Sequence, residues 1–215
     1  MLQIKQFAFN PFQVNNYILY DDTGECAIID PSCYEKHEKQ QLADFIDEKQ
    51  LKPVLLLFTH CHIDHILGSR FVSKTYKIKP RTHKDSLTFL ENSKEYGKVF
   101  GFKADRPVLP DNFIGEGDVL KFGEQELRVI YAPGHAAGSL CYHHTGEGFV
   151  VVGDVLFQNG IGRTDLPTGD HDQLIKSIFE KLLVLPDNTT VYPGHGPSTT
   201  IGQERTSNPF LTGIY

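Results

Sequence analysis

The sequence lacks the features that mark several classes of protein. Its four cysteines show no Cys-x-x-Cys spacing, which indicates reduced thiols rather than a disulfide framework. Lysine and arginine form no cluster and the formal net charge is −6, so we expect no nucleic-acid partner. No apolar run approaches the roughly 20 residues of a membrane span. Residues 1–6 have neither the charged lead-in nor the apolar core of a signal peptide. These absences predict a cytoplasmic protein that binds neither membranes nor nucleic acids.

Low-complexity tracts, repeats of fixed period and the Gly-x-Ser-x-Gly nucleophile motif are also absent. The chain has 215 residues, of which 40% are hydrophobic and 22% are charged, as is usual for a globular protein. This length is sufficient for a sizeable core. We therefore expect one domain over residues 1–215.

The pattern of apolar residues predicts the order of strands and helices. Strands are predicted at 2–9, 14–20, 26–29, 54–58, 119–122, 126–131, 139–144, 149–153 and 190–192. Helices are predicted at 34–50, 66–76, 84–100 and after a cap at Asp170, with a loop at 103–118 and a polar tail at 198–215. Strands, helices, strands and a final helix favour two sheets packed face to face with helices outside, an α+β sandwich.

The densest polar pattern is Thr-His-Cys-His-Ile-Asp-His at 59–65, directly after the apolar strand 54–58. In extended backbone His60 and His62 share one face and Cys61 points to the other. Asp64 and His65 add a carboxylate and a third imidazole. Imidazole and carboxylate ligands suit zinc, iron and manganese. Three histidines and an aspartate within six positions indicate a site for one metal ion or a pair, rather than packed core histidines.

Three other strands end in a related way. Each runs into a glycine that is followed at once by a ligand-type residue: His135, Asp154 or His195. Glycine lets the backbone turn sharply beside a metal, and rigid strand ends position the residues that follow them. Each residue alone is compatible with an ordinary turn, but the repeated pattern indicates one shared site.

The other five histidines lack this setting. We expect His37 and His171 on helix surfaces, and His143 and His144 on opposite faces of a strand. For His83, a place in the cleft remains open as an alternative to a structural role.

Four motifs in this order resemble the metallo-β-lactamase superfamily: Thr-His-Cys-His-Ile-Asp-His (59–65), Pro-Gly-His (133–135), Gly-Asp-Val-Leu-Phe (153–157) and Pro-Gly-His-Gly (193–196). Asp30 in Ile-Ile-Asp-Pro also fits the early structural aspartate of that family. Within the superfamily, Gly160–Pro167 and Pro197–Gly202 are similar to the small glyoxalase II-like (hydroxyacylglutathione hydrolase-like) branch.

The resemblance implies a four-layer αββα sandwich with two divalent metal ions at one edge of the sheets, zinc in the first place, with iron and manganese as alternatives. It implies that His60, His62 and His135 hold the first metal and that Asp64, His65 and His195 hold the second. Asp154 would bridge the two. A hydroxide between the metals would attack the substrate carbonyl, and Asp64 would also pass a proton.

The function implied is a metal-dependent thioesterase acting on S-acyl glutathione or a similar thioester. Because little of the chain follows His195, the basic residues that the C-terminal domain of glyoxalase II supplies to glutathione are not expected, and Arg163 is the candidate for binding a substrate carboxylate. The alternatives are a mononuclear iron persulfide dioxygenase with His60, His135 and Asp154 as its ligands, a lactonase, and an inactive metal-stabilised scaffold.

Overall fold

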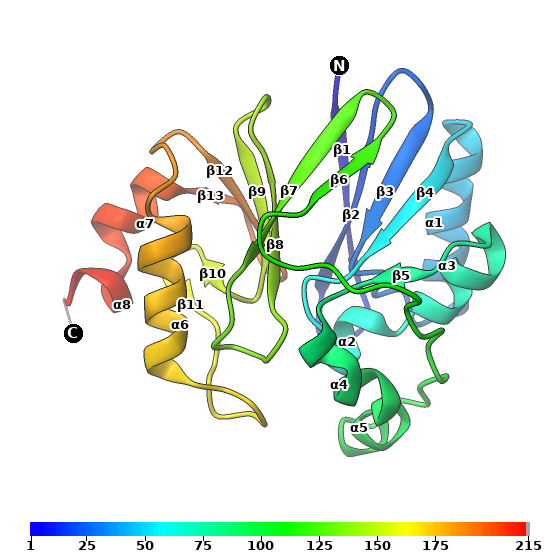
Figure 1. The fold of residues 1–215 in the computed structure, drawn as a ribbon. Coiled ribbons are helices and arrows are strands. Elements are labelled where there is room, and N and C mark those ends of the chain that lie inside the picture. The colour runs from blue at the N-terminus through cyan, green and yellow to red at the C-terminus, as the bar shows by residue number, and fades with distance from the viewer. Residues whose placement is uncertain (214–215) are drawn as a thin grey trace.

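Two β-sheets lie side by side in the computed structural model, which describes residues 1–213 (Figure 1). The first sheet has the strand order β1-β2-β3-β4-β5, and the second has the order β13-β12-β9-β8-β7-β6. Most neighbouring strands are antiparallel, but β4 runs parallel to both β3 and β5, and β9 runs parallel to β12. The first sheet contains β1 (Gln3–Phe9), β2 (Val14–Tyr20), β3 (Glu25–Ile29), β4 (Lys52–Leu57) and β5 (Pro80–Arg81). The second contains β6 (Val119–Phe122), β7 (Gln125–Tyr131), β8 (Leu140–His144), β9 (Phe149–Gly153), β12 (Thr190–Pro193) and β13 (Thr199–Thr200), and β10 (Leu156–Phe157) and β11 (Gly160–Ile161) form a separate hairpin.

Helices flank the two sheets on their outer sides (Figure 1). Beside the first sheet lie α1 (Lys36–Glu48), α2 (Ile63–Ile66), α3 (Ser69–Tyr76), a 3-10 turn (Lys84–Ser86), α4 (Leu87–Glu91) and α5 (Ser93–Val99). Beside the second lie α6 (His171–Ser177), which continues as a π-helical turn (Ile178–Leu182), α7 (Ile201–Ser207) and α8 (Pro209–Thr212). Within residues 1–213, no helix has both the length and the apolar character that crossing a membrane requires.

Three apolar clusters fill the three spaces between these four layers. Alternate residues of each central strand enter different clusters: Ile18 and Ile28 face the helices, whereas Leu19 and Ile29 face the other sheet. Val150 of β9 likewise belongs to the cluster under α6 and α7. Strands that are buried on both faces appear in the sequence as continuous apolar runs. The predicted αββα sandwich is therefore confirmed, and all nine predicted strands are present with ends shifted by at most two residues.

The predicted helix at 66–76 is wrong as a single element, because the structure has α2 and α3 separated at Gly68. The Gly68 backbone N–H donates to the Pro31 carbonyl at 2.7 Å. A Cβ atom at this position would lie 2.3 Å from the Cys33 sulfur. This close approach to the segment after β3 stops the first helix and starts the second.

Two other predictions need correction. The single helix at 84–100 is replaced by the 3-10 turn, α4 and α5, with the break at Asn92. The polar tail at 198–215 contains β13, α7 and α8, and its residues 214–215 lie outside the described residues. Glu204 explains the order of this tail: its buried carboxylate accepts hydrogen bonds from Thr199, Asn208 and the backbone of Asn159.

Asp21 joins the β2–β3 turn to the β6–β7 turn of the other sheet. Its carboxylate accepts hydrogen bonds from the Thr23 hydroxyl and N–H, the Glu124 N–H and the Gln125 amide. Although burial alone would raise the pKa of Asp21, these hydrogen bonds lower it to about 2. Asp21 thus connects the two sheets at the edge where these turns lie.

We expect Asp21→Asn to lower the free energy of unfolding by about 1–3 kcal/mol at neutral pH, since an amide NH2 would replace one acceptor oxygen. The folded-state pKa is lowered, so the contribution is present above the ordinary value of 3.8 and is lost as the pH falls towards 2. Urea unfolding at pH 7 and pH 2.5 would measure the difference between variant and wild type, which should shrink at the lower pH. The neighbouring Asp22→Asn is the control, because Asp22 is an exposed partner of the N-terminal amine. An equal loss in both variants would contradict this role of Asp21.

Candidate metal centre

Seven ligand-type side chains meet where the strands end. His60 and His62 follow β4, and Asp64 and His65 lie in α2. His135, Asp154 and His195 follow β7, β9 and β12. Three overlapping groups have ligand atoms within 4.8 Å of one another: His60–His62–His135, His60–His65–Asp154 and Asp64–His65–His195. The structure therefore brings together all seven residues to which the sequence assigned metal binding, while their individual roles remain predictions.

A glycine allows the last strand to approach this closely. A Cβ atom on Gly194 would lie 2.1 Å from Asp154 Oδ1 and 2.7 Å from His65 Cε1. Only glycine leaves room here for the carboxylate and the imidazole together. The Pro-Gly-His pattern at 193–195 thus reflects a steric requirement of the site.

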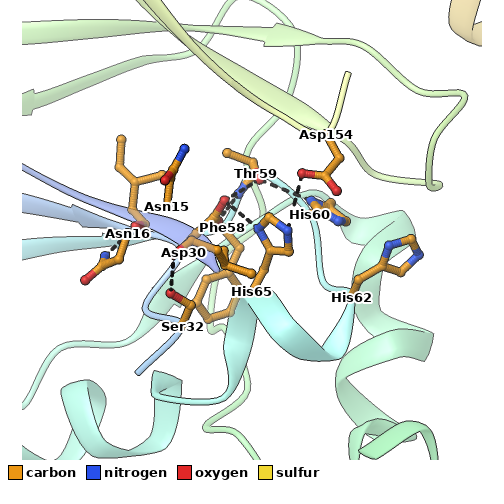
Figure 2. A network of polar contacts seen from close by, with 12 residues as sticks. Asn15, Asn16, Asp30, Ser32, Phe58, Thr59, His60, His62, His65 and Asp154 are labelled. Carbon is orange, nitrogen blue, oxygen red and sulfur yellow. Dashed lines mark hydrogen bonds and ion pairs between the residues drawn. The ribbon is translucent and has the colours of Figure 1, made fainter. Parts of the chain in front are cut away.

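Asp30 orients two of the histidines, and it lies beside His65 and Thr59 (Figure 2). Its carboxylate accepts hydrogen bonds from the Thr59 N–H at 2.7 Å and the Thr59 hydroxyl at 2.6 Å, and its Oδ2 lies 3.0 Å from His65 Nδ1. Because the Thr59 proton points at Asp30, the Thr59 oxygen can accept from His60 Nδ1 at 3.2 Å. Both imidazoles then carry a proton on Nδ1 and turn Nε2 towards the cluster.

The turn between β1 and β2 supports the other side of the cluster. The Phe12 carbonyl lies 2.9 Å from His195 Nδ1, which directs His195 Nε2 towards Asp64 and Asp154 at 3.5 and 3.4 Å. Asn10 donates its side-chain amide to the backbone carbonyls of Asp64 and Ser32 at 2.9 and 3.0 Å. The turn therefore holds two of the three residues of the Asp64–His65–His195 group.

The first group fits a metal cation. His135 Nδ1 lies 2.8 Å from the Arg163 carbonyl, which can only accept, so His135 Nε2 bears a lone pair. This atom lies 3.3 Å from His60 Nε2 and 3.0 Å from His62 Nδ1. Burial lowers the pKa of His135, His60 and His62, the last to about 3, so the three neutral rings could each offer a lone pair to a metal.

The second group is charged. Burial opposes protonation of His195 and His65, but Asp154 and Asp64 outweigh it and raise the pKa of His195 to about 9 and that of His65 well above its usual value. Burial raises the pKa of Asp154 and Asp64, yet the positive His65 keeps the pKa of each carboxyl below its usual value. Asp154 Oδ1 and His65 Nε2 form an ion pair at 3.4 Å, and neither of these buried atoms has a hydrogen bond within the described part of the chain. A cation that replaced the proton on His65 Nε2 would give both atoms a ligand role.

A cavity of about 760 Å³, open to solvent, adjoins the cluster. It is lined by four aromatic residues and by Ile63, Leu166, Pro167, Arg163 and the ligand-type residues His62, Asp64, His135, Asp154 and His195. Arg163 therefore lines the cavity, and its guanidinium forms a bidentate pair with Asp165, with both N–O distances at 2.7 Å. Its contact with a substrate carboxylate stays a prediction. His83 is absent from this lining and stacks on Tyr131. Cys61 packs in the first apolar cluster, as predicted, with its sulfur 3.6 Å from the Thr82 hydroxyl.

Sequence reasoning missed the supporting residues Asn10 and Phe12 and the aromatic wall of the cavity. In the sequence, Asn10-Pro11 indicates only a turn between the strands predicted at 2–9 and 14–20. The positive φ of 55° at Asn10 is typical of asparagine in such a turn. The hydrogen bonds to Asp64 and Ser32 span 54 and 22 residues, and no local pattern indicates contacts of that length.

We expect Asn10→Asp to weaken binding of the second of two metal ions about 10- to 100-fold, because the carboxylate cannot donate to the Asp64 carbonyl. The first metal should bind as in the wild type, since the Arg163 carbonyl and Asp30 support its histidines. Competition with a chromophoric chelator would resolve the two affinities. Gln13→Asn is the control, because Gln13 lies in the same turn and its side-chain amide donates to the Asn10 carbonyl rather than to a ligand-type residue. Equal weakening at both sites would refute a selective role for the turn.

Comparisons with known proteins agree with this geometry. The family model for the metallo-beta-lactamase superfamily matches residues 9–195. The hydroxyacylglutathione hydrolase GloC of Haemophilus influenzae is 37% identical over 213 residues, covering 98% of each chain. Among solved structures, the BLEG-1 B3 metallo-beta-lactamase has a TM-score of 0.90 at 39% identity, covering 98% of this chain and 100% of its own. TTHA1623 in a di-iron-bound form has a TM-score of 0.86 at 32% identity, covering 96% and 100%.

The family match spans most of the chain, and these relatives are covered almost completely. The ligand clusters required of a metal-dependent enzyme are present in the described residues. The chain therefore belongs to the metallo-beta-lactamase superfamily, whose relatives here include metal-dependent hydrolases.

Proposed function

We propose that the protein is a two-metal thioesterase that hydrolyses S-acyl glutathione or a similar thioester. The observation that carries this proposal is the convergence of two ligand groups beside a cavity. The name of the GloC relative supports the substrate class. All four cysteines are buried free thiols, which is consistent with the cytoplasmic location that we also propose.

Two divalent cations, zinc first among the candidates, would supply a hydroxide at neutral pH and stabilise negative charge on the carbonyl oxygen. The first would be held by His60, His62 and His135, and the second by Asp64, His65 and His195, with Asp154 reaching both groups. In the overall reaction the oxygen of water joins the acyl carbon, the carbon–sulfur bond breaks, and the sulfur leaves with the electron pair.

Asp64 is the residue that we propose to move the proton. Its carboxylate lines the cavity, with Oδ2 3.5 Å from His195 Nε2 and 3.8 Å from His65 Nε2. It can accept a proton lost by water and deliver it to the departing sulfur. Because thiols have pKa values near 8.5, the leaving thiolate needs little assistance.

The second ligand group leads us to favour this proposal over a mononuclear iron persulfide dioxygenase. Such an enzyme would need only His60, His135 and Asp154 as ligands. Here Asp64, His65 and His195 converge as well, and hydrogen bonds donated to the Asp30 carboxylate and to the Phe12 carbonyl hold His65 and His195 in place. Oxygen uptake with glutathione persulfide would instead support the one-metal enzyme.

Release of free thiol from S-lactoylglutathione tests the proposal. We expect turnover by protein loaded with Zn, Fe or Mn, detected with a thiol-reactive chromophore. Asp154→Asn should lower kcat/KM by a factor of about 100 or more, because it removes a charge shared by both ligand groups. Cys61→Ser is the matched control and should retain activity, since Cys61 faces away from the cavity.

Background rates with all three metals, for S-lactoylglutathione and for every other S-acyl glutathione supplied, would overturn the thioesterase proposal. A β-lactam is the alternative substrate to include, because the relative BLEG-1 is a B3 metallo-beta-lactamase. Opening of a β-lactam ring without thiol release would favour that activity instead.

Arg163 gives a prediction about the thiol part of the substrate. If its guanidinium binds a carboxylate of that part, Arg163→Ala should raise KM about 3- to 10-fold with little change in kcat. Asp165→Asn should lower KM, because Asp165 competes for the same two N–H groups. Steady-state kinetics on both variants would measure this. A rise of KM in both variants would instead assign the Arg163–Asp165 pair a structural role in its loop.

A further inference from the structure

The cavity beside the ligand cluster has an aromatic wall. Phe89 of α4, Tyr96 of α5, Phe100 after α5 and Phe12 of the β1–β2 turn all line it. Helices α4 and α5 lie together at one end of the first sheet, on the side of α2 (Figure 1). Two separate segments of the chain therefore contribute rings to one surface.

The rings form two contacting pairs. Phe12 and Phe100 meet edge to face with centroids 6.1 Å apart, and Phe89 and Tyr96 lie 5.6 Å apart. Phe89 also packs on the ring of His62 at 5.2 Å. The wall thus adjoins a ligand-type histidine.

Part of this aromatic surface is open. Phe12 is 45% exposed and Phe100 is 42% exposed, whereas Phe89 is only 4% exposed. Exposed apolar surface beside a polar centre is stabilised when a ligand covers it. An apolar group that leaves the ligand cluster along the wall would bury the exposed parts of Phe12 and Phe100.

The cavity lining contains further apolar residues. Leu166 and Pro167 line the cavity together with Arg163, whose guanidinium is bonded to Asp165. A hydroxyl on the acyl group would lose water against these surfaces, and burying a hydroxyl without a partner is unfavourable.

We propose that the substrate carries an apolar acyl group, such as a hexanoyl or phenylacetyl group, and that the wall formed by Phe12, Phe89, Tyr96 and Phe100 binds it. This rests on the proposed thioesterase function and narrows its substrate class. Hydroxyacyl groups such as lactoyl are poorer substrates because the wall gains less contact with them. Phe100 is a specificity-determining residue on this proposal.

A series of glutathione thioesters with one thiol and different acyl groups tests this directly. We expect kcat/KM of the metal-loaded enzyme to rise about threefold to fourfold for each buried methylene, from acetyl through butyryl to hexanoyl. The ratio of kcat/KM for hexanoyl to that for lactoyl should exceed about 10. Phe100→Ala should lower this ratio about 10-fold.

Phe179→Ala is the matched control. Phe179 is 45% exposed, close to the value for Phe100, but it lies on the π-helical turn beside the second sheet and does not line the cavity. This variant should keep the wild-type ratio. Loss of the ratio in both variants would overturn the assignment of Phe100.

A flat or reversed acyl series would overturn the inference and leave the thioesterase proposal standing. If no thioester is hydrolysed, the thioesterase proposal fails. A binding measurement then tests whether the aromatic wall still prefers an apolar group. Isothermal titration of the zinc-loaded protein with hexanoate and with lactate, the two acid products, should show at least about 10-fold tighter binding of hexanoate. Phe100→Ala should remove that difference, and equal binding of both acids by the wild type would overturn the inference.

Discussion

The hydrogen bonds of the Asp30 carboxylate determine how the first sheet presents its ligands. One oxygen receives the Thr59 N–H, and the other receives the Thr59 hydroxyl and faces His65 Nδ1. Asp30 is 1% exposed, and a buried carboxylate is stable only when its oxygens have partners. The ends of β3 and β4 and the start of α2 are therefore held in one arrangement. The left-handed backbone at Asp30, with φ of 48°, turns the chain so that this side chain points back under the cluster.

The two halves of the cluster are supported in different ways. His60 and His135 are fixed by neutral groups, the Thr59 hydroxyl and the Arg163 carbonyl, and both remain unprotonated because they are buried. His65 and His195 lie beside Asp154, and their pKa values are raised. A cation entering the second half must displace protons, so its affinity depends more steeply on pH than that of the first half. Histidines that look equivalent in the sequence thus differ in pKa, because carboxylates lie beside some of them and neutral groups lie beside the others.

The sequence predicted the sandwich and the cluster for the same physical reason. Strands buried on both faces appear in the sequence as long apolar runs, and the ligand-type residues that follow such runs meet at a sheet edge. The sequence of β9 therefore predicted both a buried strand and the position of Asp154 at its end. Short helices are harder to predict, because contacts distant in sequence decide where they end. Gly68 separates α2 from α3 through its approach to Pro31 and Cys33. The buried Glu204 similarly orders a tail that reads as polar, through bonds to residues that include Asn159, 45 positions away.

Phe12 shows why the cavity could not be deduced from motifs. Its carbonyl oxygen fixes the orientation of His195, and its ring forms part of the cavity wall with Phe100. A backbone carbonyl has no sequence signature, and an isolated phenylalanine after Asn10-Pro11 reads only as part of a turn. Yet this residue contacts both the ligand cluster and the surface proposed to bind the acyl group. A substrate that packs on the Phe12 ring would press on the same turn that orients His195, so substrate recognition and ligand geometry are mechanically linked at this position.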